Sequence, residues 1–298
     1  MPALEALVHG GYEVVAVITT PNTPVGRKQT LTPSPVKLAA QKLGLKVLQP
    51  ENLKEVSQVA SYKLEASVGV VVSYGKIIPQ TVIDLFPLGL LNIHASLLPK
   101  YRGPSPIQHA LLSGDSETGV TIIKIDEKID HGPILKKVTF RHPVSESYEK
   151  VEDSLAKLGA DLLIKTLPDY LAGKIKPQPQ DDSQATFTKI ITKEDGKIDW
   201  HKEAKEIYNQ FRAFHKWPGI WTEWRNKTLK IIDCRVRQGA PVSDRGALST
   251  GMLFQENNQI FVPCAKGHLE IFGLQLEGGK VLTSKEFING YGRFLRSA

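Results

Sequence analysis

Three polar residues in two short segments have the side-chain types that acid–base chemistry requires. Asn92 and His94 stand two positions apart at the end of a predicted strand, so both side chains project from the same face. Asp130 lies in a predicted turn between two later strands. Together they offer an amide donor, a titratable imidazole and a carboxylate to orient it. We expect them to share one pocket, because open α/β sheets bind ligands at the carboxyl ends of their strands.

Each of these residues also has an ordinary structural interpretation. An Asn at a strand end is commonly a turn former, a single His is commonly a buried core residue, and Asp130 alone would be a surface turn residue. The surrounding string favours chemistry, because its length argues against coincidence. It reads Asn92-Ile93-His94-Ala95-Ser96-Leu97-Leu98-Pro99-Lys100-Tyr101-Arg102-Gly103. This string, with the Asp130 segment at the expected distance, resembles the signature of the folate-dependent formyltransferases.

The resemblance implies a site and a reaction. It implies that Asn92, His94 and Asp130 are catalytic, and that Ser96, Leu97, Leu98 and Pro99 form part of a folate pocket. The co-substrate would be 10-formyltetrahydrofolate, with no permanently bound cofactor and no metal. Asn92 and a protonated His94 could stabilise the oxyanion that forms when an amine attacks the formyl carbon. Asp130 would hold the imidazole and favour its charged form.

The resemblance covers the chain from about Pro2 to the C-terminus and is strongest to the branch that formylates methionine on initiator tRNA. The segment Val15–Lys37 is similar to a basic loop of that branch, and Lys189–Glu194 and Arg212–Gly219 resemble its C-terminal domain. The implied fold is α/β, a Rossmann-like formyltransferase domain followed by a small β-rich, OB-like barrel domain. The implied tRNA contacts are Arg27, Lys28, Arg212, Arg225, Lys227 and Lys230.

The charge distribution agrees with an anionic partner. The formal net charge is +7 and the pI is about 9.2. Between Phe211 and Val242 seven basic residues face two acidic ones, a local excess of 7 − 2 = +5. A basic stretch of this kind is typical of phosphate contacts, although a solvated basic face is the plain alternative.

The remaining patterns predict two domains and their elements. We expect a catalytic domain over residues 1–172, a linker over 173–184 and the tRNA-binding domain over 185–298. Strands are predicted at 12–19, 66–72, 90–93, 120–125, 134–140, 229–236, 260–263 and 269–274. Helices are predicted from Pro35, with Ser34 as N-cap, and at 79–85, 105–112, 146–171 and 202–214. The segment 20–33 is predicted to be a loop. Trp200 and Trp217 are expected in the core of the second domain.

Several expectations concern context. Members of the family begin with a strand and a Gly-Thr-Pro turn, whereas this sequence begins within the helix that follows, so we expect it to lack the first strand. If that absence is real, a catalytically impaired RNA-binding protein is one alternative function; a sugar-nucleotide N-formyltransferase is another. No apolar run approaches the roughly 18 residues of a membrane span. Cys234 and Cys264 show no metal or disulfide spacing, which suits a reducing compartment, so we expect a cytoplasmic protein. We expect a monomer, because a two-domain tRNA enzyme has no need of symmetry.

Overall fold

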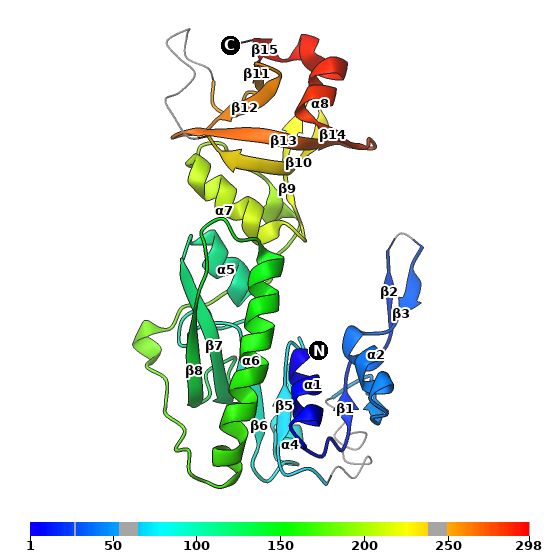
Figure 1. The fold of residues 1–298 in the computed structure, drawn as a ribbon, viewed down its shortest axis with the longest axis vertical. Helices are drawn as coiled ribbons and strands as arrows, with labels where there is room; N and C mark the ends of the chain where they lie inside the picture. The colour runs from blue at the N-terminus through cyan, green and yellow to red at the C-terminus, as the bar shows by residue number, and fades with distance from the viewer. Residues whose placement is uncertain (27, 54–64, 238–248, 298) are drawn as a thin grey trace. The chain divides into compact units, whose positions relative to one another are not determined.

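The chain folds into two compact units, according to a computed structural model that describes residues 1–26, 28–53, 65–237 and 249–297. Residues 1–106, 117–141 and 152–189 form the first unit, and residues 107–116, 142–151 and 190–298 form the second. The first unit combines helices with strands, whereas the second is largely an antiparallel sheet (Figure 1). This division confirms the predicted fold class.

A four-stranded sheet forms the centre of the first unit, in the order β5-β6-β7-β8. The first two strands, β5 (Gly69–Val71) and β6 (Leu90–His94), are parallel. The other two, β7 (Glu117–Lys124) and β8 (Ile134–Arg141), continue the sheet in antiparallel fashion. All four strands overlap predicted segments, because each is a run of β-branched and apolar residues.

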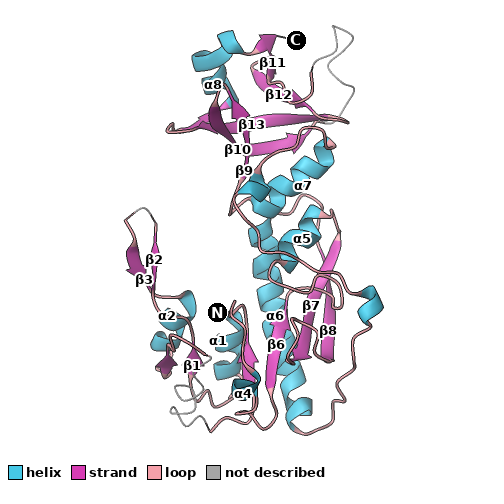
Figure 2. Cartoon of the chain, turned by 180° about the vertical axis from the view of Figure 1, so that it is seen from behind, coloured by secondary structure: helices cyan, strands magenta, loops and turns pink. Residues whose placement is uncertain are grey.

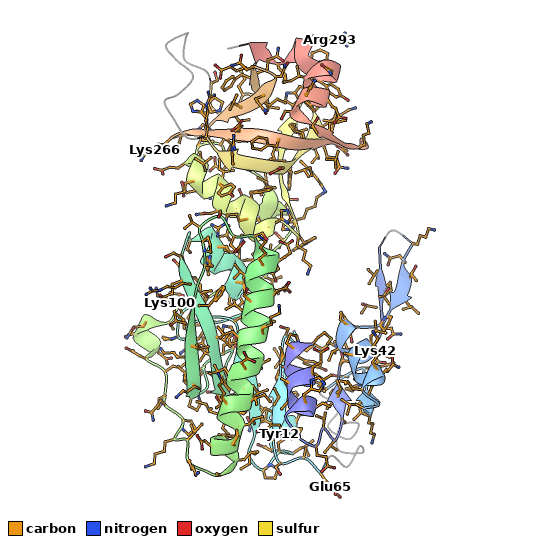
Figure 3. All side chains as sticks on the ribbon, in the orientation of Figure 1. Tyr12, Lys42, Glu65, Lys100, Lys266 and Arg293 are labelled. Carbon is orange, nitrogen blue, oxygen red and sulfur yellow. The ribbon has the colours of Figure 1, made fainter. Side chains whose placement is uncertain are left out.

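The sheet is covered on the side of β6 and β7 by the long helix α6 (Tyr148–Leu171) (Figure 1). A Cβ at Gly159 would lie 2.7 Å from Ile93 Cγ2 and 3.4 Å from Val120 Cγ1, so glycine permits this close approach. Side chains fill the space between the helix and the sheet (Figure 3). Six consecutive residues of β7, from Thr118 to Ile123, are buried, as expected for a strand covered on both faces.

The remaining helices before α6 are short. The cap of α2 is the predicted one, since Ser34 Oγ accepts a hydrogen bond from the backbone N–H of Lys37 at 3.3 Å. Among the described helices, none is long and apolar enough to cross a membrane. The bounds are α1 (Pro2–His9), α2 (Pro35–Lys42), α4 (Gln80–Ile83) and α5 (Pro106–Leu112).

Two N-terminal predictions need correction. The predicted strand 12–19 is reduced to β1 (Val17–Ile18), because its parallel partner β4 (Val47–Leu48) offers a ladder of only two residues. The predicted loop 20–33 is wrong, because it contains a hairpin of β2 (Thr23–Val25) and β3 (Thr30–Thr32). The three prolines and the glycine favour a loop, but two short strands that contain Thr and Val pair here. A hydrogen bond from Gln29 N to Gly26 O at 3.2 Å closes the turn between them. The hairpin projects from the first unit (Figures 1 and 2).

The second unit is built on a seven-stranded sheet. Its order is β15-β11-β12-β13-β10-β9, with β14 paired to β13. Helix α7 (Ala204–Phe214) contacts β9, β10 and β13, and helix α8 (Ser284–Tyr291) contacts β12, β13 and β14. The strands are β9 (Ile220–Trp224), β10 (Lys227–Val236), β11 (Phe254–Glu256), β12 (Gln259–Pro263), β13 (His268–Leu276), β14 (Val281–Thr283) and β15 (Arg296–Ser297).

The two tryptophans predicted in this core differ. Trp200 is half-buried, and its Nε1 donates to Thr222 Oγ1 at 3.0 Å. Trp217 is 56% exposed, so its predicted core position is wrong. It lies just beyond α7, in the connection to β9. Trp200 also lies outside the strands but bonds to Thr222 of β9, so burial of a large aromatic ring depends on its contacts and not on its residue type alone.

Candidate active site

The three predicted catalytic residues converge within the first unit. Asn92 and His94 lie at the carboxyl end of β6, which is held between β5 and β7. Asp130 lies in the connection between β7 and β8. The three side chains therefore lie close together at the carboxyl end of β6, while their shared pocket and catalytic role stay predictions.

The Asp130 carboxylate is the centre of the cluster. Its Oδ1 accepts a hydrogen bond from Asn92 Nδ2 at 3.1 Å and lies 3.5 Å from His94 Nδ1. Its Oδ2 accepts from the backbone N–H of Gly103 at 2.8 Å. The His94 and Asp130 side chains are 6% and 15% exposed, so the group is nearly enclosed. The hydrogen bonds from Asn92 and Gly103 fix the position of this carboxylate beside His94.

His94 has a partner at each ring nitrogen. Nε2 lies 2.9 Å from the carbonyl oxygen of Tyr101, and Nδ1 faces Asp130. A carbonyl oxygen only accepts, so Nε2 must carry a proton in this arrangement. Nδ1 can donate to Asp130 only when the ring is protonated as well. His94 is therefore held between a backbone carbonyl and a carboxylate, one at each ring nitrogen.

The backbone around the cluster is unusual at two non-glycine positions. Tyr101 and Asp130 have φ values of +62° and +47°, in the left-handed region that costs most residues about 1–2 kcal/mol. Asp tolerates this region better than most. Two positions later, a Cβ at Gly132 would lie 1.8 Å from the carbonyl oxygen of Lys124, so only glycine fits there. The Asp130 loop is thus bent tightly against the end of β7.

The segment Ser96–Pro99, predicted to contribute to a folate pocket, forms a tight turn after β6. The next residue, Lys100, marks its position in Figure 3. Ser96 and Leu98 are fully buried, with Ser96 Oγ donating to Lys100 O at 2.6 Å. Thr121 Oγ1 donates to Ser96 O and accepts from Leu98 N. Only Leu97 and Pro99 are partly exposed. Ser96 and Leu98 therefore shape the turn from inside, and their part in a folate pocket, like that of Leu97 and Pro99, stays a prediction.

A second layer of polar residues surrounds the Asp130 loop. Arg102, 3% exposed, donates to Gln180 Oε1 and to Asp182 Oδ1, and that hydrogen bond holds the pKa of the Asp182 carboxyl below its usual range. His131 lies between Asp126 and Asp182, with nitrogen–oxygen distances of 2.6 and 3.4 Å. Within the described parts of the chain, no group of three or more His, Cys, Asp or Glu side chains is arranged to hold a metal.

The sequence did not predict two kinds of partner in this site, namely backbone groups and the side chain of Gln180. Tyr101 and Gly103 act through a carbonyl and an N–H, which residue identity does not reveal. Gln180 donates to the carbonyl oxygens of Asp130 and Gly132, although it comes from the predicted linker. Nothing in that Pro-, Lys- and Gln-rich stretch marks Gln180 as different from its neighbours.

The basic residues predicted to contact tRNA fall into three groups. Lys28, Arg225, Lys227 and Lys230 are exposed. Arg27 lies outside the described residues, and its role stays a prediction. Arg212 is a correction, because it is 2% exposed, with Nε donating to Glu146 O at 2.8 Å and Nη1 to Asn209 Oδ1 at 3.1 Å. Burial lowers its pKa and removes it from any phosphate.

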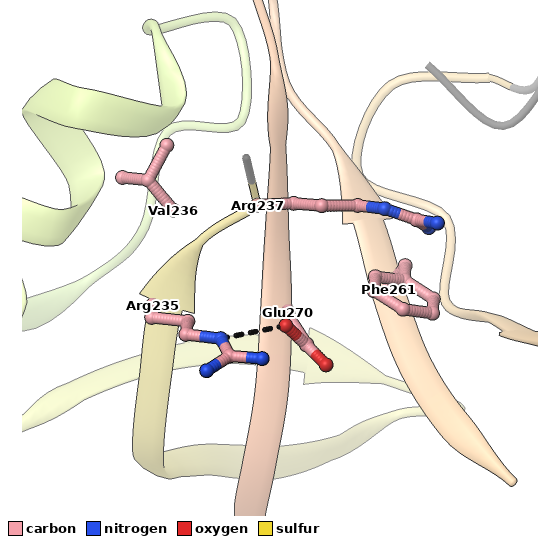
Figure 4. Close-up of a pocket in the computed structure, with 5 residues that line it drawn as sticks. All are labelled: Arg235, Val236, Arg237, Phe261 and Glu270. Carbon is pink, nitrogen blue, oxygen red and sulfur yellow. Dashed lines mark hydrogen bonds and ion pairs between the residues drawn. The ribbon is translucent and has the colours of Figure 1, made fainter. Parts of the chain in front are cut away.

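Two further arginines of the basic stretch line a cavity of about 450 Å³ in the second unit (Figure 4). Arg235 Nε donates to Glu270 Oε2 at 2.7 Å. Arg237 Nη1 donates to Glu256 Oε2 at 3.0 Å, and its guanidinium lies 4.1 Å from the centre of the Phe261 ring. Both guanidinium groups are therefore paired with carboxylates, although the Arg235 side chain is 63% exposed and the Arg237 side chain 26%.

Comparison with known families gives two matches that together span most of the chain. Residues 3–167 match the model of the formyl transferase family, and residues 190–292 match the model of the formyl transferase C-terminal domain. The first match contains Asn92, His94 and Asp130. The second covers most of the second unit.

Individual relatives point the same way. The chain is 44% identical to a methionyl-tRNA formyltransferase of Solibacter usitatus, over 97% of this chain and 92% of that protein. It is 48% identical to a methionyl-tRNA formyltransferase of Chloroflexus aurantiacus, over 78% and 76%. Among solved structures, an N-formyltransferase from Helicobacter canadensis in complex with folinic acid and dTDP-3-aminofucose aligns with a TM-score of 0.67 at 21% identity. That alignment covers 90% of this chain and 93% of the other and establishes a shared fold.

Proposed function

This chain belongs to the formyl transferase family, and from that premise we propose that it transfers the formyl group of 10-formyltetrahydrofolate to the amino group of methionine carried on initiator tRNA. The observation that carries the proposal is the convergence of Asn92, His94 and Asp130 inside the segment that matches the family. Relatives that align with nearly the whole chain are methionyl-tRNA formyltransferases by name, which favours methionyl-tRNA over an amino sugar as acceptor.

The reaction has a simple balance. The neutral methionine nitrogen attacks the formyl carbon, a new C–N bond forms and the carbonyl oxygen becomes an oxyanion. The bond between that carbon and the folate nitrogen then breaks. The attacking amine loses a proton and the departing folate nitrogen gains one. The protein must therefore stabilise an oxyanion and move a proton, and the cluster contains groups for both tasks.

Asn92 is the group best placed to stabilise the oxyanion. An amide carries two N–H donors, and the contact with Asp130 uses one of them. The second remains for the substrate oxygen. Because the first hydrogen bond fixes the amide, the donor is oriented before the reaction begins. A preorganised donor of this kind contributes about 3 kcal/mol to transition-state stabilisation.

His94 is the group that can carry the proton. In the described state both ring nitrogens have partners, so a proton reaches the folate nitrogen only if one contact is exchanged during the reaction. Asp130 holds the ring in place while that contact is exchanged. Loss of one proton from the imidazolium would leave a neutral ring, ready to accept the proton that the attacking amine releases.

The proposed division of labour assigns folate and chemistry to the first unit. Leu97 and Pro99 would contact the folate, while Ser96 and Leu98 shape their turn. The tRNA would be bound through the exposed basic residues. Those described are Lys28 on the β2–β3 hairpin, and Arg225, Lys227 and Lys230 in the second unit. We place the activity in the cytoplasm, where charged initiator tRNA is used, and assign it to a monomer.

The test is transfer of labelled formyl from 10-formyltetrahydrofolate, with charged initiator methionyl-tRNA and amino-sugar nucleotides offered in parallel. We expect label on the methionine of the tRNA and none on the sugars. Label on a sugar nucleotide alone would assign the chain to the sugar branch. Binding of tRNA with no transfer to either acceptor would identify an RNA-binding protein without this activity.

A further inference from the structure

The segment that follows α6 lies along the two loops that hold the candidate site. Gln178 exchanges two backbone hydrogen bonds with Ile134, at 2.7 and 2.8 Å. Further on, Arg102 N donates to Thr186 O and Thr188 N donates to Arg102 O, both at 2.8 Å. The chain is therefore anchored at both ends of the stretch 178–188. Gln180 and Asp182 lie between these anchors, beside the loops.

The Gln180 side chain joins those two loops. Its Nε2 donates to the carbonyl oxygen of Asp130 at 2.9 Å and to that of Gly132 at 2.8 Å. Its Oε1 accepts from Nε and Nη2 of Arg102, at 3.0 and 2.9 Å. Both amide hydrogens are thus used on the loop that carries Asp130. The amide oxygen is used on the loop that contains Gly103, whose N–H binds the Asp130 carboxylate.

Arg102 is itself fixed, which makes Gln180 part of a rigid bridge. Its side chain is 3% exposed, and Nη2 also donates to Asp182 Oδ1 at 2.8 Å. A buried guanidinium is stable only with its hydrogen bonds satisfied, so Arg102 in turn requires the Gln180 oxygen. The bridge therefore connects the two sides of the Asp130 carboxylate through one amide group.

We infer that Gln180 is a positioning residue for the reaction, which holds the Asp130 backbone so that its carboxylate meets Asn92, His94 and Gly103. Asp130 has a left-handed backbone, at φ +47°, which the surrounding contacts must maintain. Its carbonyl oxygen is held by Gln180 on one side of the residue, and its carboxylate is held by Gly103 on the other. The inference rests on the proposed function, because it assigns Gln180 a role in the same site.

Two substitutions separate positioning from a merely structural role. Gln180→Ala removes both the donors to the Asp130 loop and the acceptor for Arg102. Gln180→Glu keeps an acceptor for Arg102 but replaces the donors with oxygen, which faces two carbonyl oxygens. If positioning is the role, kcat falls about 10- to 100-fold in both variants, since a shift of about 1 Å in a reacting group can cost a factor of 10². KM for folate and for charged tRNA stays within about threefold.

Gln178→Ala is the matched control. It is the same residue type in the same segment, but its side chain is exposed and donates only to Lys176 O. We expect it to leave kcat unchanged. Wild-type kcat in Gln180→Glu would overturn the inference, because it would show that holding Arg102 is all that Gln180 does. In the Asp130→Ala background, Gln180→Ala should add no further loss of kcat; a full additional loss would also overturn it.

A readout independent of activity separates this inference from the proposed function. Hydrogen exchange at the Gly103 amide reports on its bond to Asp130 Oδ2. We expect faster exchange in Gln180→Ala and Gln180→Glu and wild-type exchange in Gln178→Ala. If the wild-type chain formylates no tRNA, the proposed function fails while this measurement still decides whether Gln180 holds the loop. Unchanged exchange in both Gln180 variants would refute the positioning role.

Discussion

Replacing Asp130 by asparagine tests the proposed site with the least disturbance of its shape. Asparagine has nearly the same volume and tolerates the left-handed backbone that Asp130 adopts at φ +47°. The loop is therefore expected to keep its course. What changes is chemistry: one carboxylate oxygen becomes an NH₂ group and the negative charge disappears.

Neither orientation of the new amide satisfies its surroundings. With NH₂ at the position of Oδ2, it faces the N–H of Gly103, which now donates to that oxygen at 2.8 Å. With NH₂ at the position of Oδ1, it faces the amide of Asn92 and Nδ1 of His94. Either way at least one buried donor loses its acceptor, at a cost of about 1–3 kcal/mol in stability. His94 also loses the negative charge beside its Nδ1.

The expected effect on turnover is larger than the effect on folding. Acid–base groups contribute about 10²- to 10⁴-fold to rate, which corresponds to roughly 3–5 kcal/mol in the barrier. We expect kcat to fall by that factor in Asp130→Asn, with KM for both substrates within a few-fold of wild type. The assay is transfer of labelled formyl to charged initiator tRNA at saturating folate, with thermal unfolding followed in parallel.

Asp126→Asn is the control for this prediction. Asp126 lies on the same loop, pairs with His131 at 2.6 Å and accepts a hydrogen bond from the backbone N–H of Lys128. Neither contact involves Asn92 or His94. Its replacement should change kcat by no more than about threefold. If Asp130→Asn stays folded and its kcat also lies within threefold of wild type, Asp130 does not take part in the chemistry and the assignment of the trio is wrong.

Three further predictions concern the second unit. Arg212→Ala should lower the free energy of unfolding by about 2–3 kcal/mol in urea titrations, because it leaves buried acceptors unpaired, and should leave the salt dependence of tRNA binding unchanged. Lys227→Ala and Lys230→Ala should each weaken tRNA binding and flatten the slope of log K against log salt by about 0.9, with folate binding unaffected; unchanged slopes would remove them from the interface. Burial raises the pKa of the Cys264 thiol from 9.0 to about 11. Above about pH 9 the unfolded chain loses this proton, whereas the folded chain keeps it. The contribution to stability is therefore fully present below about pH 9 and is lost as the pH rises to 11. The fall in unfolding free energy between pH 8 and 10.5 should be smaller in Cys264→Ala; an equal fall would contradict the assignment.

The parts of the site that sequence predicted are those set by local geometry. Asn92 and His94 are two apart on one strand, and the period of a strand places them on one face whatever the rest of the chain does. Asp130 was linked to them by resemblance to a family, and the structure supplies the contacts. Gln180 had no such signal, because its role depends on the segment 178–188 pairing with Ile134 and Arg102, residues far away in the sequence.

Secondary structure was predictable where a partner strand is long. The strands of the central sheet are predicted correctly because each apolar run has a neighbouring strand that pairs with it over several residues. The segment 12–19 has the same kind of run, but it pairs only over Val17 and Ile18, since β4 is that short. In the segment 20–33 proline and glycine favour a loop, whereas Pro24 lies within a short exposed hairpin and Gly26 within its turn. Pairing is a property of two segments, and one segment's composition does not fix it.

The basic stretch shows the same dependence in its charges. Counting within residues 211–242 gives an excess of +5, but carboxylates outside that range neutralise part of this charge. Arg235 is paired with Glu270 and Arg237 with Glu256, and Arg212 is buried against the carbonyl oxygen of Glu146. Arg212 is therefore removed from the surface, whereas Arg235 and Arg237 keep exposed area but have a carboxylate beside their charge. An RNA phosphate is expected to interact most with exposed residues such as Lys227 and Lys230, so the affinity for tRNA should depend on fewer contacts than the count of seven suggests.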